Sequence, residues 1–177
     1  GHVKRPGVYE APMGRISLRQ LLYDESFGQG IAGGRPLKAV IPGGASAPWF
    51  YDEHVDQPLE PGAVGGAGSM LGSGGVTVME EGTSMVWAAL RLMEFFYHES
   101  CGKCSPCREG SSWLVQTMRR IMAKRGQMQD LETLTDLCKN IAGRTVCAFG
   151  DAEVSPIMST LKHWRHEYVA LIHEAEA

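Results

Sequence analysis

From residue 83 onward, apolar side chains recur at the spacing of an amphipathic helix. Thr83 or Ser84 is a suitable N-cap, so the pattern predicts a helix that runs through His98. Its apolar stripe consists of Met85, Ala89, Leu92, Met93 and Phe96. A second helix is expected after Ser105-Pro106, with serine as the cap and proline at the first helical position. Its buried face consists of Leu114, Met118, Ile121 and Met122.

Two further helices are predicted with short connections. Asp130 is the expected cap of the third, which covers residues 131–142 and stops at Gly143. Ser155-Pro156 is expected to open the fourth. The apolar stripe of the fourth consists of Ile157, Leu161, Trp164, Tyr168 and Leu171. Four helices joined in this way predict a small four-helix bundle.

The first 83 residues have a different pattern, with short apolar runs between turns rich in glycine and proline. The strand candidates are residues 7–10, 37–41 and 76–79. Ser17 is the expected cap of a short helix from Leu18 to Asp24. A strand, a short helix and two more strands suggest a compact β-grasp unit of the ubiquitin-like type. The expected fold class is therefore α+β, with a β-grasp domain at residues 1–83 and a four-helix bundle at residues 84–177.

Composition restricts the possible functions. The net charge of −3 gives no broad basic surface for nucleic acid. The most apolar segment, from Met85 to Tyr97, is interrupted by Arg91 and Glu94 and is too short to span a bilayer. No targeting segment precedes Gly1, which looks like a point inside a longer chain.

A glycine-rich stretch at residues 62–75 is a weak candidate for nucleotide binding. It lacks the Gly-Lys-Ser/Thr ending of a phosphate-binding loop and the spacing of a dinucleotide-binding turn. Its glycines are more typical of tight turns.

The cysteines carry the most specific chemical signal. Cys101, Cys104 and Cys107 have Cys-x2-Cys-x2-Cys spacing, and Cys147 follows in a later loop. A tight turn with a thiolate at every third residue places three ligands on a short arc, and a remote cysteine can supply the fourth. Four cysteine thiolates are the ligands of a [4Fe–4S] cluster. The pattern thus favours these four cysteines as cluster ligands.

Two other interpretations of the cysteines fit the spacing less well. Structural zinc sites usually have two Cys-x2-Cys pairs, or one pair with two histidines, and a triplet with a distant single cysteine matches that poorly. A disulfide framework suits small secreted domains, whereas this chain is large enough to need no such staples. A zinc-stapled module for protein interaction remains the alternative of a different functional class.

Other residues near the motif give less specific signals. Cys138 shares a helical face with Leu131, Leu134 and Ile141, so it is expected in the core. Lys103 and Arg108 flank the ligands and are candidates for stabilising a reduced cluster. The aromatic residues expected to shield the bundle and the cluster from water are Trp113, Phe149 and Trp164.

The two cysteine segments also resemble a known family. Glu-Ser-Cys-Gly-Lys-Cys-Ser-Pro-Cys-Arg-Glu-Gly at residues 99–110, with Arg-Thr-Val-Cys-Ala-Phe-Gly-Asp-Ala at 144–152, resembles the NADH-binding flavoprotein subunit of respiratory complex I. The family includes the diaphorase subunits of NAD-linked hydrogenases and formate dehydrogenases. The resemblance covers only the C-terminal half of such a subunit. It also implies that residues 38–44 belong to a soluble-ligand-binding β-grasp module.

The resemblance implies a function in NADH:quinone oxidoreductase. In that family NADH reduces FMN, and one [4Fe–4S] cluster takes electrons from the flavin and passes them toward quinone. The FMN and NADH sites lie in an N-terminal flavin domain, and nothing in these residues matches them, so the chain alone is not expected to react with NADH. The implied partners are that flavin domain, the small [2Fe–2S] subunit and the large iron–sulfur subunit of the peripheral arm. The implied location is peripheral, on the cytoplasmic or mitochondrial-matrix side of the inner membrane.

Overall fold

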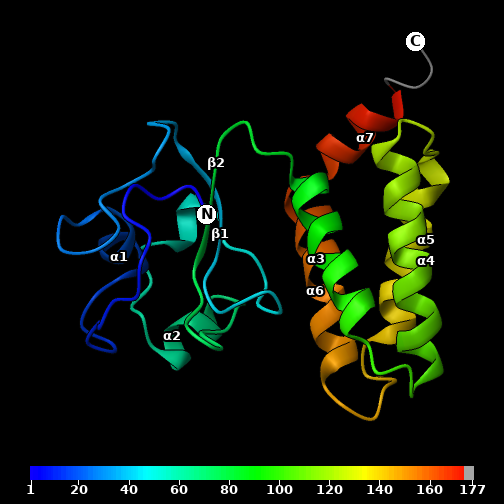
Figure 1. Ribbon diagram of the computed structural model, residues 1–177, viewed down its shortest axis with the longest axis horizontal. Helices are drawn as coiled ribbons and strands as arrows, with labels where there is room; N and C mark the ends of the chain where they lie inside the picture. The colour runs from blue at the N-terminus through cyan, green and yellow to red at the C-terminus, as the bar shows by residue number, and fades with distance from the viewer. Residues whose placement is uncertain (174–177) are drawn as a thin grey trace. The chain divides into compact units, whose positions relative to one another are not determined.

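A computed structural model describes residues 1–173 of the chain (Figure 1). The chain divides into two compact units, of which the first is Gly1–Thr83 and the second begins at Ser84. The fold is α+β and mostly helical, with a small sheet in the first unit and a bundle of helices in the second.

The sheet of the first unit has two antiparallel strands, β1 (Leu37–Ile41) and β2 (Thr77–Glu80). Val40 pairs with Val78 of β2 and also forms an isolated antiparallel bridge with Phe50 on its other side. These three residues are almost completely buried and belong to the apolar core of the unit. Strand β1 has the predicted bounds, and β2 lies within one residue of its prediction.

Short helices pack around this sheet. Helix α1 (Leu18–Tyr23) begins with a capping box, in which Ser17 accepts from Gln20 and the Gln20 side chain accepts from Ser17. Leu18 and Leu22 of this helix join the core. A 3₁₀ turn (Asp52–His54) and helix α2 (Pro61–Gly66) complete the regular elements that the structure describes in this unit. A cavity of about 600 Å³, lined largely by apolar side chains, lies in the same unit.

One prediction for the first unit needs correction. The strand expected at residues 7–10 does not form, because Val8 is fully exposed and Tyr9 instead packs edge-on against Phe27. The glycine-rich stretch overlaps α2, which starts at Pro61 because proline suits the first helical turn, and beyond α2 it forms tight turns with Gly68, Gly72 and Gly74 at positive φ.

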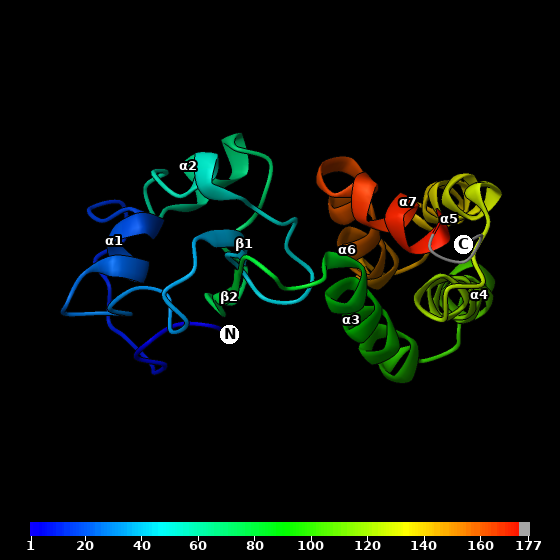
Figure 2. The same ribbon diagram turned by 90° about the horizontal axis from the view of Figure 1, so that it is seen from above.

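The second unit contains five helices among its described residues. Their bounds are α3 (Met85–Glu99), α4 (Ser105–Met122), α5 (Met128–Ile141), α6 (Phe149–His163) and α7 (Arg165–His173). Seen close to their axes in Figure 2, α3, α4, α5 and α6 surround one core. The largest fully buried side chains of this core are Met85, Met93, Leu114, Met118, Ile121, Leu131, Leu134, Ile141, Ile157 and Tyr168.

The expectation of four helices was wrong at the C-terminal side of the bundle. Helix α6 starts at Phe149, six residues before the predicted start, and Pro156 lies inside it. The predicted stripe is then divided between α6 and α7 at Trp164, whose backbone leaves the helical region with φ −128° and ψ 31°. The buried Trp164 side chain accounts for the apolar signal that continued across this break.

Among residues 1–173, none of the helices is both long and apolar enough to cross a membrane.

Candidate metal centre

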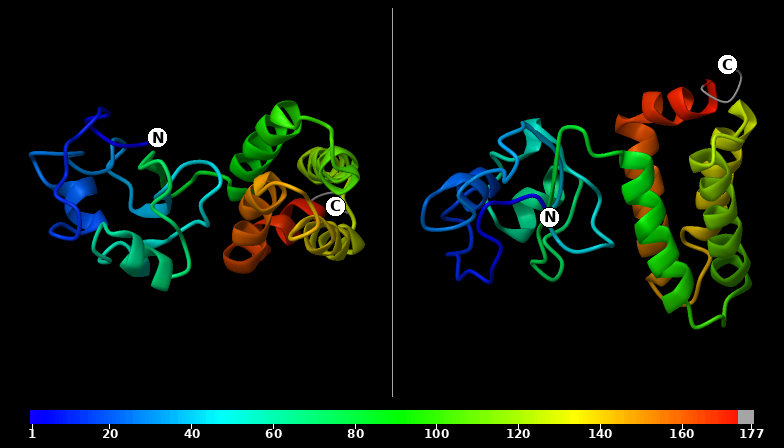
Figure 3. Two further views of the ribbon diagram at one scale, coloured as in Figure 1. Left: turned by 90° about the horizontal axis from the view of Figure 1, so that it is seen from below. Right: turned by 45° about the horizontal axis from the view of Figure 1, so that its top comes forward.

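Two loops meet at one end of the bundle (Figure 3), and they carry three of the predicted ligands, while Cys107 lies in the first turn of α4. The first joins α3 to α4, and the second joins α5 to α6. Cys101, Cys104 and Cys107 follow the first connection into α4, and Cys147 lies just before α6. The backbone N–H of Val146 donates to Cys104 Sγ at 3.5 Å, so the two loops are in direct contact.

The first loop is shaped by a glycine and an arginine. Gly102 has φ +72°, a left-handed conformation that residues with a β-carbon rarely adopt. Arg108 Nη1 donates to the Gly102 carbonyl oxygen at 2.9 Å, which ties the first turn of α4 back to the loop. Cys104 is the N-cap of α4.

The second loop is held by polar contacts of its own. Gly143 ends α5 with φ +68°, and its N–H donates to Asp151 Oδ1 at 2.8 Å. The Thr145 hydroxyl donates to the Cys147 carbonyl oxygen at 2.8 Å. These contacts fix the backbone on both sides of Val146, which is 93% exposed.

The four cysteines have different exposures. Cys107 is buried, Cys104 is half-buried, and Cys101 and Cys147 are exposed. All four are free thiols. Among residues 1–173, the side chains of His, Cys, Asp and Glu do not form a group of three or more already arranged around one metal ion.

Cys107 lies between two polar side chains from different elements. The hydroxyl of Ser100, the C-cap of α3, is 3.2 Å from Cys107 Sγ. Glu153 of α6 lies on another side, with Oε2 at 3.6 Å from the same sulfur. Burial raises the pKa of the Cys107 thiol, and the hydrogen bond from Ser100 partly offsets that effect. Binding of a metal would therefore have to displace a proton from this sulfur.

Glu153, which no sequence pattern indicated, is completely buried. Its other oxygen, Oε1, has no hydrogen-bond partner. Burial raises the pKa of Glu153 to about 7, and its hydrogen bond with Cys107 acts in the opposite direction. A single glutamate in the sequence Asp-Ala-Glu-Val gave no periodic signal that would mark it as buried.

Cys138 is in the core, as predicted. It is 1% exposed on α5, and burial raises its pKa to about 12, with a further contribution from Glu153. A thiol with such a pKa stays protonated near neutral pH and is a poor metal ligand.

The predictions for the flanking residues have mixed outcomes. Lys103 is exposed, and Arg108 contacts the loop backbone through Gly102 rather than a cysteine sulfur. Trp113 does not shield the core, since it is 54% exposed on α4. Phe149 packs edge-on against Phe96 with ring centroids 5.6 Å apart, at the start of α6.

The residues present suit an iron–sulfur cluster. Thiolates are the preferred ligands of soft metals, and two cysteine-bearing loops contact one another at one bundle end. The N-terminus of α4 and the N–H of Val146 supply positive partial charge beside the sulfurs. Such donors compensate the negative charge that a four-thiolate cluster carries.

Comparison with known proteins agrees with this chemistry. Residues 87–171 match the family described as NADH-ubiquinone oxidoreductase-F iron-sulfur binding region. The F subunit of NADH-quinone oxidoreductase of Streptomyces coelicolor is 53% identical over 168 residues, which is 95% of this chain and 36% of the relative. The F 2 subunit of the Rhizobium meliloti enzyme is 51% identical over 174 residues, covering 98% of this chain and 41% of the relative.

Solved structures show the same fold in a related assembly. An NAD⁺-reducing [NiFe]-hydrogenase in the air-oxidised state aligns with a TM-score of 0.85 and 26% identity, covering 97% of this chain and 28% of that chain. The chain thus spans well under half the length of these relatives. The chain is homologous to part of the NADH-quinone oxidoreductase F subunit, and its residues 87–171 belong to the iron–sulfur binding region of that family.

Proposed function

We propose that this chain is the electron-transfer segment of an NADH-quinone oxidoreductase F subunit, with one [4Fe–4S] cluster held by Cys101, Cys104, Cys107 and Cys147. The observation that carries the proposal is the contact between the two cysteine loops, through Val146 N–H and Cys104 Sγ. It supports a common site for loops whose contacting residues are 42 positions apart in the sequence.

In this proposal the chain's residues perform three tasks. The four cysteine sulfurs bind iron, and a [4Fe–4S] cluster supplies one-electron redox chemistry when it is bound. Arg108 and Gly102 hold the first loop closed. The buried side of the site, at Cys107, excludes water, whereas the side at Cys101 and Cys147 is open to a redox partner.

The proposed reaction context extends beyond this chain. Electrons pass from NADH to FMN in a flavin domain of the same subunit, then through this segment toward quinone. We assign no FMN or NADH residue here. The proposed neighbours are the small [2Fe–2S] subunit and the large iron–sulfur subunit, in a peripheral arm on the cytoplasmic or mitochondrial-matrix side of the inner membrane.

A second candidate is a diaphorase subunit of an NAD-linked hydrogenase or formate dehydrogenase. The observation in its favour is the TM-score of 0.85 with the chain of an NAD⁺-reducing [NiFe]-hydrogenase. The quinone-linked assembly is favoured by sequence identity, because the two F subunits of NADH-quinone oxidoreductase are 53% and 51% identical to this chain.

We also propose that the first unit is a β-grasp module of the soluble-ligand-binding type, serving as scaffold. The pairing of β1 with β2, the bridge from Val40 to Phe50 and the packing of α1 on the same core support it. Amide hydrogen bonds across additional strands, measured by NMR, would establish the β-grasp; a lone two-stranded sheet would refute it.

The proposed function is tested by comparing which reductants, dithionite or NADH, can reduce the cluster. A hydride carries two electrons and the cluster takes one, so a flavin is needed between them. The reconstituted 177-residue chain should be reduced by dithionite but remain oxidised with NADH alone. Addition of the flavin domain should restore reduction by NADH.

The measurement is bleaching of the visible cluster absorbance together with the EPR signal of the reduced cluster. Rapid bleaching by NADH without flavin would contradict the proposal and would indicate an overlooked nucleotide site. Failure of dithionite to reduce a loaded chain would contradict its role in electron transfer.

A further inference from the structure

The four cysteine sulfurs differ in one respect that bears on redox properties. Cys107 is buried, and the side-chain hydroxyl of Ser100 lies 3.2 Å from its Sγ atom. Cys101 and Cys147 are exposed to solvent. Hydrogen bonds in a buried environment are electrostatically stronger than in water, so the contact at Cys107 is the one expected to matter most.

The direction of this hydrogen bond follows from the chemistry of the ligand. A cysteine sulfur that binds iron is a thiolate and has no proton to donate. The Ser100 hydroxyl must then donate to Cys107 Sγ. Its oxygen also accepts the N–H of Gly102 at 3.3 Å, within the first cysteine loop. A hydroxyl that accepts one hydrogen bond is polarised and donates a second more strongly.

The contact between Ser100 and Cys107 is fixed by the position of Ser100 at the end of a helix. Ser100 is the C-cap of α3, and its N–H donates to the Phe96 carbonyl oxygen at 3.0 Å. Cys107 lies in the first turn of α4. Ser100 therefore joins the end of one helix to the start of the next, through a sulfur and through the Gly102 turn.

From these contacts we infer that Ser100 is a positioning residue that raises the reduction potential of the cluster through its hydrogen bond to Cys107. This inference rests on the proposed function, because it requires Cys107 to be an iron ligand. Reduction adds negative charge that the sulfurs share, so the hydroxyl–sulfur bond is stronger in the reduced state. Removing the hydroxyl would make the reduced state less stable and lower the potential.

The test uses two substitutions of nearly equal shape. Ser100→Thr keeps the hydroxyl, and Ser100→Val replaces it with a methyl group. Ser105→Ala is the matched control, because Ser105 lies at the start of α4 and its hydroxyl accepts from Arg108 instead of contacting a sulfur. Each reconstituted chain is titrated with a reductant at fixed pH, and the reduced cluster is followed by EPR. Iron and sulfide content are measured on the same samples.

Ser100→Val is expected to shift the one-electron equilibrium toward the oxidised cluster by up to about tenfold, which is about 59 mV of reduction potential. Ser100→Thr and Ser105→Ala should stay near the unsubstituted chain, with full iron content in all variants.

Three results would overturn the inference while leaving the proposed function intact. The first is equal reduction potentials for Ser100→Thr and Ser100→Val. The second is a shift in the potential of Ser105→Ala as large as that of Ser100→Val. The third is loss of iron from Ser100→Val alone, which would mean that the hydroxyl serves cluster assembly and does not set the potential. Absence of a cluster from the unsubstituted chain would instead refute the proposed function.

Discussion

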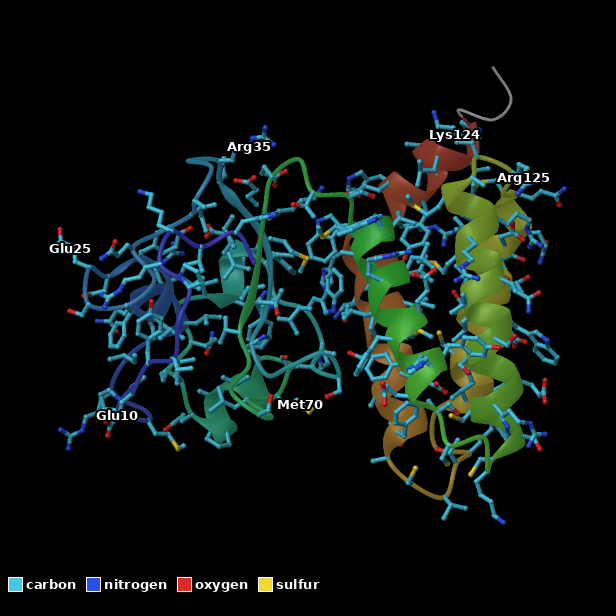
Figure 4. The ribbon with its side chains drawn as sticks, in the orientation of Figure 1. Glu10, Glu25, Arg35, Met70, Lys124 and Arg125 are labelled. Carbon is cyan, nitrogen blue, oxygen red and sulfur yellow. The ribbon has the colours of Figure 1, made fainter. Side chains whose placement is uncertain are left out.

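The two ends of the helical bundle are completed in different ways. At the end where α4 turns into α5, the chain supplies its own contacts. Asp130 accepts from Gln127 N–H at 2.8 Å and forms a two-point ion pair with Arg120, while Glu167 accepts the N–H of Met85 at 2.8 Å. Figure 4 shows Lys124 and Arg125 at this same end, in the turn after α4.

At the opposite end, each cysteine loop has polar contacts of its own, and a cysteine sulfur lies where the two loops meet. Cys101, Cys147 and Val146 are exposed, and the link between the loops is one N–H···S contact of 3.5 Å. One end is thus closed by the protein itself, whereas we propose that the other is completed by iron. Substitutions at the first end should change stability, and substitutions of the cysteines at the second should change metal content.

The largest expected effect is at the cysteines. Replacing Cys101, Cys104, Cys107 or Cys147 with alanine should abolish or cripple cluster assembly, because each change removes the protein thiolate of one iron. Iron and sulfide analysis of anaerobically purified variants measures it. Cys138→Ala is the control and should keep full iron content, since Cys138 is a core residue on α5. Iron retained in Cys147→Ala but lost in Cys138→Ala would show that the fourth ligand was assigned wrongly.

The second-largest effect is expected on removal of iron, which should change hydrogen exchange at the two ends to different extents. Metal binding contributes folding free energy where ligand loops lack other strong contacts. Anaerobic chelation should speed hydrogen exchange most in the cysteine loops and the adjoining turns of α4 and α6. The end that contains Asp130 should change less, and residues 1–83 least. Exchange that changes only within residues 1–83 would count against the comparison.

A smaller effect is expected at the end that the protein closes itself. Asp130→Ala removes the acceptor for the Gln127 N–H in the capping box and the partner of Arg120, so it should lower the free energy of unfolding by about 2 kcal/mol. Chemical denaturation measures the loss. The reduction potential of the reconstituted cluster should not move. A shift in potential as large as that of Ser100→Val would mean that the two ends are coupled.

The smallest predicted effect concerns a buried hydroxyl in the same region. Tyr168 of α7 is fully buried, and its hydroxyl lies 2.7 Å from Thr160 Oγ1, which donates to the Pro156 carbonyl oxygen at 2.8 Å. Tyr168→Phe should lower the free energy of unfolding by about 1 kcal/mol, the net value of one hydrogen bond. Tyr97→Phe is the matched control, because Tyr97 is 48% exposed. Equal losses in both variants would exclude a specific role for the buried pair.

The helices were largely readable from the sequence because their signals are local. Ser84 caps α3 as expected, with its hydroxyl accepting from Trp87 N–H at 3.2 Å, and Cys138 lies in the core as its periodicity indicated. Asp130 was expected to cap α5, but it is the third helical residue of a capping box that Gln127 begins. The prediction therefore placed Asp130 correctly at the start of α5 but gave it the position of the N-cap, which lies three residues earlier.

The surroundings of the candidate site were less readable because they depend on tertiary contacts. Ser100 looked like part of a motif, yet its contact with Cys107 requires the turn at Gly102. Glu153 reaches Cys107 only because α6 begins early, at Phe149. The pair Ser155-Pro156 was interpreted as a helix start, so the prediction placed the start of this helix too late. In the structure, Pro156 is accommodated inside α6.

We propose that the open end of the bundle holds one [4Fe–4S] cluster. The most direct measurement combines elemental analysis of the anaerobically purified chain with EPR after dithionite reduction. We expect a brown protein with about four iron and four sulfide atoms per chain and the signal of a reduced cluster. A colourless protein with stoichiometric zinc, no sulfide and no such signal would contradict it.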